Sequence, residues 1–269
     1  MEVFVPTFNS ERTLANCLRT IRKEIPNAKI LIIDNESHDR TQKIAESFGV
    51  KFVSMSANLG MVRSHFCQLA EDDWFLMVDS DVLLGDGWFK TMLHYRDSLK
   101  NAGAISSTLK DKHTVLEPNL QSAHNCFQRW KAEKSTVRFA PLKNPKRMLT
   151  AAVLLKKEAC EGFSSNAFCY EDYVLQKHVQ QKGYDVYTVD APAEHDILIS
   201  ASKLKLRAIC QGASMREYGD VSFSHLLATM FYTPLIKAPF GCKRYTFMQY
   251  WNLFEGYIHA SKYQNQHWG

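Results

Sequence analysis

Two carboxylates stand two residues apart at the end of an apolar run, where Asp79 and Asp81 follow the segment WFLMV. In an extended segment residues i and i+2 point to the same side, so both side chains can face one ligand. Carboxylate oxygens are preferred ligands of Mg²⁺ and Mn²⁺, which often carry substrate phosphates. The spacing therefore favours a divalent-metal site. The alternative is a solvated loop whose Asp residues cap the next helix.

The elements that must position these acids alternate through the first two-thirds of the chain. Strand-like runs cover 2–8, 29–34, 50–55 and 74–79, and helix-like segments cover 10–25, 38–49 and 60–71. This alternation predicts right-handed βαβ units and an α/β fold with a mostly parallel sheet flanked by helices. Ligands bind such sheets at the carboxyl ends of the strands. We therefore expect Asp34, which ends the second run, to lie near Asp79 and Asp81.

Composition narrows the class of protein. The 269 residues include 33 Lys and Arg against 28 Asp and Glu, and the net charge of +5 is too small for a nucleic-acid-binding signature. Seven Cys residues without a Cys-x-x-Cys pair argue against a disulfide framework or a structural zinc site. A cytoplasmic location is expected, because neither a signal peptide nor a run of about 18 apolar residues is visible.

Five motifs in order carry a family resemblance: VPTFNSERTL, IIDNESHDRT, NLGMVRS, VDSDV and YEDYVLQKHVQQKGYDV. The chain resembles the family 2 nucleotide-sugar glycosyltransferases, which have the GT-A fold. The resemblance runs from Met1 to about His195. It departs from the family at Glu36, where glycine is usual.

The resemblance implies an inverting, metal-dependent glycosyltransferase of the hexosyltransferase type. Its donor would be a UDP-, GDP- or dTDP-linked sugar. Its acceptor would be a hydroxyl or phosphate of a glycan or lipid carrier. A divalent cation, Mn²⁺ or Mg²⁺, stabilises the leaving pyrophosphate in such reactions.

The resemblance also implies a role for individual residues. Asp81 binds the metal directly, Asp79 contacts the ribose or a metal-bound water, and His195 completes the metal site. Asp34 reads the base. The full set of expected donor contacts is Pro6, Thr7, Asn9, Glu11, Asp34, Asn58, Gly60, Arg63, Asp79 and Ser80. The alternatives are an exposed first-turn acid for Glu11, an exposed helix arginine for Arg63 and a structural histidine for His195.

A pair of acids supplies the catalytic candidates. Family members use the second acid as the general base that takes the acceptor's proton, which indicates Asp172. Its neighbour Glu171 is expected to point elsewhere, towards an acceptor hydroxyl. Direct in-line attack implies inversion at the anomeric carbon. The alternative is a pair of acids that stabilises a helix N-terminus.

The pattern changes after the resemblance ends. We expect a GT-A domain over 1–198 and a helical C-terminal region over 199–269 that contacts an acceptor, a membrane surface or another subunit. Aromatic residues flanked by Lys237, Lys243 and Arg244 suit a helix in the membrane interface, peripheral to the inner membrane face. The alternative is a helical subdomain packed on the sheet or on the twin subunit of a homodimer.

Two rival functions remain at this stage. One is a catalytically silent nucleotide-sugar or glycan-binding protein on the same scaffold. The other is a metal-dependent phosphohydrolase of the haloacid-dehalogenase type. That class places the Asp-x-Asp on its first strand and has Thr or Val at the position of Leu83, and both conditions fail here.

Overall fold

The computed structural model describes residues 1–132, 141–167, 169–218 and 221–263. The strands are β1 (Glu2–Thr7), β2 (Lys29–Asp34), β3 (Lys51–Ser54), β4 (Trp74–Val78), β5 (Val82–Leu84), β6 (Ala102–Ser107), β7 (Lys110–Val115), β8 (Leu142–Lys143), β9 (Ala152–Lys156), β10 (Asp185–Val189) and β11 (Ala193–Ile199).

The helices are α1 (Leu14–Glu24), α2 (Thr41–Ser47), α3 (Leu59–Leu69), α4 (Trp88–Ser98), α5 (Pro118–Ala132), α6 (Lys157–Cys160), α7 (Glu171–Gln181), α8 (Ala201–Glu217), α9 (Phe223–Tyr232), α10 (Lys243–Ile258) and α11 (Ala260–Tyr263). Two short turns, the π-helical η1 (Thr233–Lys237) and the 3₁₀ η2 (Phe240–Cys242), separate α9 from α10.

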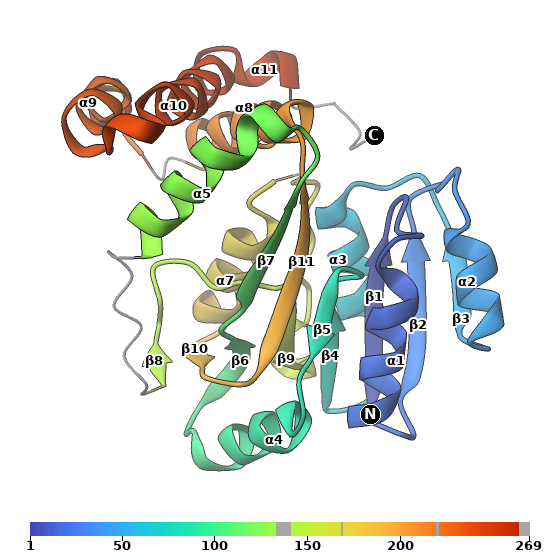
Figure 1. The fold of residues 1–269 in the computed structure, drawn as a ribbon. Coiled ribbons are helices and arrows are strands. Elements are labelled where there is room, and N and C mark those ends of the chain that lie inside the picture. The colour runs from blue at the N-terminus through green and yellow to red at the C-terminus, as the bar shows by residue number, and fades with distance from the viewer. Residues whose placement is uncertain (133–140, 168, 219–220, 264–269) are drawn as a thin grey trace.

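The main sheet has the strand order β3-β2-β1-β4-β9-β6-β10-β8, and β5, β11 and β7 form a small second sheet. Strands β3, β2, β1 and β4 run parallel, as do β6 and β10, which confirms the predicted mostly parallel sheet flanked by helices (Figure 1). Strand β9 lies antiparallel between β4 and β6. The apolar run of β9 predicts burial but not strand direction, so this reversal was not foreseen.

The pleat of β1 divides the core between the two faces of the main sheet. Val3 and Val5 pack with Leu18 of α1 on one face, whereas Phe4 packs with Phe66 of α3 on the other. The Phe4 and Phe66 rings stack with their centroids 5.0 Å apart. Because both faces are covered here, the central strands β1 and β4 are mostly apolar, as is usual for buried parallel strands.

Helices α5 and α8–α11 gather beyond the end of the sheet at which β1 and β2 finish (Figure 1). Glycines let α8 and α10 cross closely, because a Cβ on Gly212 would overlap the Leu253 carbonyl and one on Gly256 would overlap that of Ile209. Within the described residues, no helix is both long enough and apolar enough to cross a bilayer.

Candidate active site

Asp34 is fixed at the carboxyl end of β2 by its neighbours. The register of β1 and β2 sets Thr7 opposite Asp34, and the Thr7 hydroxyl donates to Asp34 Oδ1 at 2.6 Å. Ser37 donates its backbone N–H to Oδ2 at 2.7 Å and its hydroxyl to Oδ1 at 2.6 Å. These three donors hold the buried carboxylate in one orientation at the edge where ligands bind.

The turns that flank Asp34 use left-handed backbone. Asn9 has a φ of 46° and Glu36 a φ of 53°, in the region that glycine adopts without strain. Glu36 therefore takes the backbone conformation that the family's usual glycine would take. The turns are tied together, because Asn9 N–H donates to Ser37 Oγ at 2.7 Å and His38 N–H donates to Asn9 Oδ1 at 3.0 Å.

Other residues predicted for the donor site lie around the same edge. Pro6 is buried in β1, and the Ser80 hydroxyl lies 2.9 Å from that of Ser10. Glu11 pairs with Arg40 of the next βα turn at 3.2 Å. Strand β1 thus joins the Asp34 turn to the Asp-Ser-Asp turn that follows β4.

The small sheet brings His195 to Asp81. Strand β11 pairs with β5 so that His195 lies opposite Val82, and His195 Nε2 is 3.2 Å from Asp81 Oδ1. The other ring nitrogen, Nδ1, lies 3.5 Å from Asp111 of β7, a residue that sequence reasoning missed. Burial alone would lower the pKa of His195, but hydrogen bonds to Asp111 and Asp81 raise that pKa to about 10.

The residue types at this point suit a divalent cation, since carboxylate and imidazole are common ligands of Mn²⁺. Asp81 and His195, two of the three predicted ligands, converge. The third, Asp79, turns towards Arg63. Among the described residues, no group of three or more His, Cys, Asp or Glu side chains is arranged to hold a metal ion. Any metal held here would need oxygens from a bound substrate as well.

Arg63, expected as a diphosphate contact, is buried, so the alternative of an exposed helix arginine is wrong. Its side chain is only 1% exposed, and its Nη2 lies 3.0 Å from Asp79 Oδ1. Its Nε lies 3.5 Å from Glu171 Oε1. One buried guanidinium therefore joins the Asp-x-Asp turn to the start of α7.

The start of α3 explains why Arg63 points inwards. Asn58 caps the helix by accepting from Met61 N–H at 3.0 Å, and its Nδ2 donates to the Asn166 carbonyl at 2.7 Å. A Cβ on Gly60 would overlap the Ala167 carbonyl, so glycine permits this close approach. Asn58 and Gly60, both expected donor contacts, contact the segment that precedes α7.

The two acids at the start of α7 have different partners. Glu171 faces Arg63, whereas Asp172 accepts from Arg147 Nε, with its Oδ2 at 2.9 Å and its Oδ1 at 3.1 Å. The Arg147 guanidinium also lies 4.4 Å from the centroid of the Tyr170 ring. Their divergence agrees with the expectation that adjacent helix positions point apart. Arg147 was missed, because nothing in its local sequence links it to Asp172.

Glu171 provides a pH-dependent prediction. Burial raises the pKa of Glu171 to about 7, against the opposing charge of Arg63 and with repulsion from Asp172. The folded state therefore retains a proton that the unfolded state loses above a pH of about 4.5, so stability falls as pH rises from there to about 7. Glu171→Gln has no titrating carboxyl at this position, so it should lack this fall of stability with rising pH.

Thermal unfolding between pH 5 and pH 8 checks the prediction. The melting temperature of the wild type, relative to that of Glu171→Gln, should fall with rising pH. The exposed carboxylate variant Glu46→Gln should follow the wild type. Parallel curves for wild type and Glu171→Gln would show that burial does not raise the pKa of this group.

Sequence comparison decides the family. The model of the family described as glycosyl transferase family 2 matches residues 2–161, more than half of the chain. This chain belongs to glycosyl transferase family 2. This match counts against the phosphohydrolase alternative.

Individual relatives agree with this family. Protein RfbJ of Shigella flexneri is 33% identical over 81 residues, which cover 29% of this chain and 62% of RfbJ. The chain thus spans less than two-thirds of that relative. Glucosyl-3-phosphoglycerate synthase from Mycobacterium tuberculosis, solved with Mn²⁺ and UDP-glucose, has a TM-score of 0.57 at 14% identity, with 83% of this chain and 80% of that chain covered.

A second solved structure is similar over nearly all of this chain. The mannosyltransferase PcManGT from Pyrobaculum calidifontis, in complex with GDP-mannose and Mn²⁺, has a TM-score of 0.58 at 13% identity, with 96% of this chain and 73% of that chain covered. At these identities the likeness supports the GT-A fold alone.

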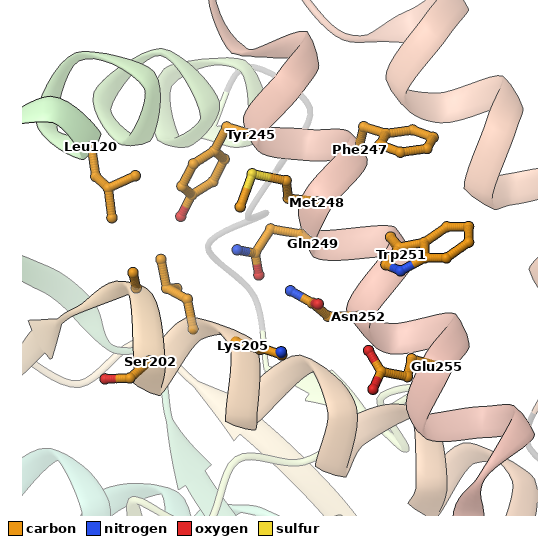
Figure 2. Close-up of a pocket in the computed structure, with 12 residues that line it drawn as sticks. Leu120, Ser202, Lys205, Tyr245, Phe247, Met248, Gln249, Trp251, Asn252 and Glu255 are labelled. Atoms are coloured by element: carbon orange, nitrogen blue, oxygen red, sulfur yellow. The ribbon is translucent and has the colours of Figure 1, made fainter.

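A groove of ≈ 650 Å³ lies apart from the predicted donor residues. All the residues that line it belong to α5, α8 and α10. Figure 2 shows Gln249 and Asn252 of α10 facing α8 across this groove, while Phe247 and Trp251 extend to the other side of α10. None of the residues that line this groove is among the predicted donor-binding, catalytic or metal-binding residues.

Proposed function

We propose that this enzyme binds a nucleotide-diphosphate sugar at the carboxyl ends of β1, β2 and β4 and transfers the sugar with inversion. The observation that supports this most is the Arg63 guanidinium, which contacts both Asp79 and Glu171. It brings the Asp-x-Asp turn and the start of α7, where Asp172 lies, to one place. Sugar transfer requires this proximity, because the donor's diphosphate and the attacking acceptor must lie on opposite sides of one anomeric carbon.

The chain's own residues then have distinct tasks. Asp34, held by Thr7 and Ser37, receives the nucleoside. Asp172 takes the proton of the acceptor hydroxyl as that oxygen attacks the anomeric carbon from the face opposite the diphosphate. Glu171 and Arg63 position these groups through their mutual contact and do not touch the substrate.

A divalent cation would be held by Asp81 and His195, and when bound it would offset the charge of the leaving diphosphate. The two similar structures support this proposal, because each contains Mn²⁺ together with a nucleotide sugar. The proposed acceptor is a hydroxyl or phosphate of a glycan or lipid carrier, and the proposed location is the cytoplasm.

His195→Ala should weaken Mn²⁺ binding in the presence of UDP or GDP by about tenfold or more. Loss of a residue that merely hydrogen-bonds a metal ligand already lowers metal affinity by this factor, and loss of the ligand itself should lower it at least as much. Calorimetric titration with Mn²⁺ measures this directly. The control is His94→Ala, which removes an exposed imidazole on α4. An unchanged Mn²⁺ titration for His195→Ala would remove this residue from the metal site.

Thermal shift with UDP-, GDP- and dTDP-linked sugars, each with and without Mn²⁺, tests the proposed function. A ligand that binds the folded state alone raises the melting temperature. At least one nucleotide sugar should do so, and more strongly with Mn²⁺. The absence of any shift across the panel would contradict a donor site.

A further inference from the structure

Helix α9 is apolar on both of its faces. Leu226 and Met230 point into the protein and are buried. Phe223, Leu227 and Phe231 recur every four residues on the outside and are 49%, 37% and 46% exposed. Ser224 and His225 also lie on the exposed side, but large apolar side chains gathered on the outside of a helix normally contact protein or lipid. Among the residues that the structure describes, none therefore covers the outer face of α9.

Exposed apolar side chains continue from α9 through the turns to α10. The apolar face consists of Phe223, Leu227, Phe231, Tyr232, Leu235, Ile236, Phe240 and Trp251. Ring contacts connect the two helices. The ring centroids of Phe223 and Phe254 are 5.9 Å apart, and those of Phe254 and Trp251 are 6.4 Å apart. Figure 1 shows α9 and α10 together at the outer side of the helical region.

Cations border the apolar face. Lys237 Nζ lies 4.9 Å from the centroid of the Tyr232 ring, and Lys243 Nζ donates to the Leu235 carbonyl at 2.9 Å. Arg244 is exposed one residue further on. The sequence from Val221 to Phe254 contains no Asp or Glu. The face thus combines exposed apolar groups with positive charge, and the nearest acids in the sequence, Asp220 and Glu255, flank this stretch.

We propose that the apolar face docks on the surface of a bilayer that contains anionic lipids. Aromatic side chains such as Tyr232 and Trp251 favour the membrane–water interface, and Lys and Arg beside them pair with anionic headgroups. A second copy of the chain fits less well. In a two-fold symmetric contact the same face meets itself, so the cations of both copies would share one interface, to which the stretch from Val221 to Phe254 supplies no acid.

Sedimentation with phosphatidylcholine vesicles, with and without phosphatidylglycerol, tests this proposal on the full chain. The protein should sediment with the anionic vesicles and be released by high salt. The most useful variant is Ile236→Ser/Phe240→Ser, because these side chains are 68% and 92% exposed and contribute little to folding. It should bind at least about tenfold more weakly, since each residue loses its insertion into the apolar phase.

Two further kinds of variant test the roles of charge and of position in vesicle binding. Lys237→Glu/Arg244→Glu should weaken binding to anionic vesicles by about fivefold or more for each residue. Leu69→Ser removes a side chain that is 50% exposed on α3 and should leave vesicle binding unchanged. The donor-induced thermal shift should persist in every variant, so failure of this proposal is distinguishable from failure of the proposed function.

Two outcomes would overturn the proposal. One is the absence of sedimentation with vesicles of either composition. The other is a concentration-dependent dimer that Ile236→Ser/Phe240→Ser converts to monomer, which would assign the apolar face to a second copy of the chain.

Discussion

Replacement of Asp172 by asparagine is expected to lower the rate of sugar transfer by a factor of about 10²–10⁴, the usual contribution of a general base. The amide of asparagine cannot take the acceptor's proton. Its carbonyl oxygen can still accept from Arg147 Nε, which lies 2.9 Å from the native carboxylate. Donor binding and the fold should therefore survive.

The measurement is transfer or donor hydrolysis at saturating nucleotide sugar, with donor affinity determined in parallel. Asp97→Asn is the matched control, since it removes an exposed carboxylate on α4 that pairs with Arg96. Retained turnover in Asp172→Asn would exclude this residue as the base. Loss of donor affinity together with turnover would assign Asp172 to donor binding.

Arg63→Met is expected to destabilise the protein by about 3–5 kcal/mol, the typical cost of removing one partner from a buried ion pair. Here one guanidinium serves two carboxylates, Asp79 at 3.0 Å and Glu171 at 3.5 Å. Desolvation raises the pKa of Asp79 and of Glu171, and the charge of Arg63 opposes both shifts. Without Arg63, the half-buried Asp79 and the buried Glu171 would both lose this cationic partner.

Denaturant unfolding measures this cost. Arg63→Met/Glu171→Gln should be less destabilised than the Arg63→Met variant, because neutralising one acid removes part of the repulsion. Arg19→Met, at an exposed position on α1, should change stability by less than about 1 kcal/mol. A similarly small change for Arg63→Met would contradict the buried network and restore a role for Arg63 at the surface.

Much of the fold follows from local pattern. The βα alternation places β1 to β4 and their helices within a few residues of the observed bounds. Helix α1, for example, covers Leu14–Glu24 within the expected 10–25. Such segments are predictable because burial on one helix face or on both sheet faces imposes a period on the sequence. The antiparallel direction of β9 depends on tertiary contacts and leaves no such period.

The site is less predictable, because its long-range partners have no local signal. Asp111 lies in a polar strand, and only its parallel register with β11 brings it to His195. Arg147 lies between β8 and β9, and only the tertiary fold brings its side chain to Asp172. The burial of Arg63 depends on the close approach of Gly60 to Ala167, which no motif describes.

Proton NMR of the sugar first released from a nucleotide sugar in the presence of Mn²⁺ tests the proposed mechanism most directly. The donor should be one that stabilises the enzyme in the thermal-shift panel. With an α-linked donor, in-line attack under Asp172 catalysis should yield the β-anomer first, and Asp172→Asn should abolish its formation. Initial release of the α-anomer, or no release from any donor that binds, would contradict an inverting transferase at this site.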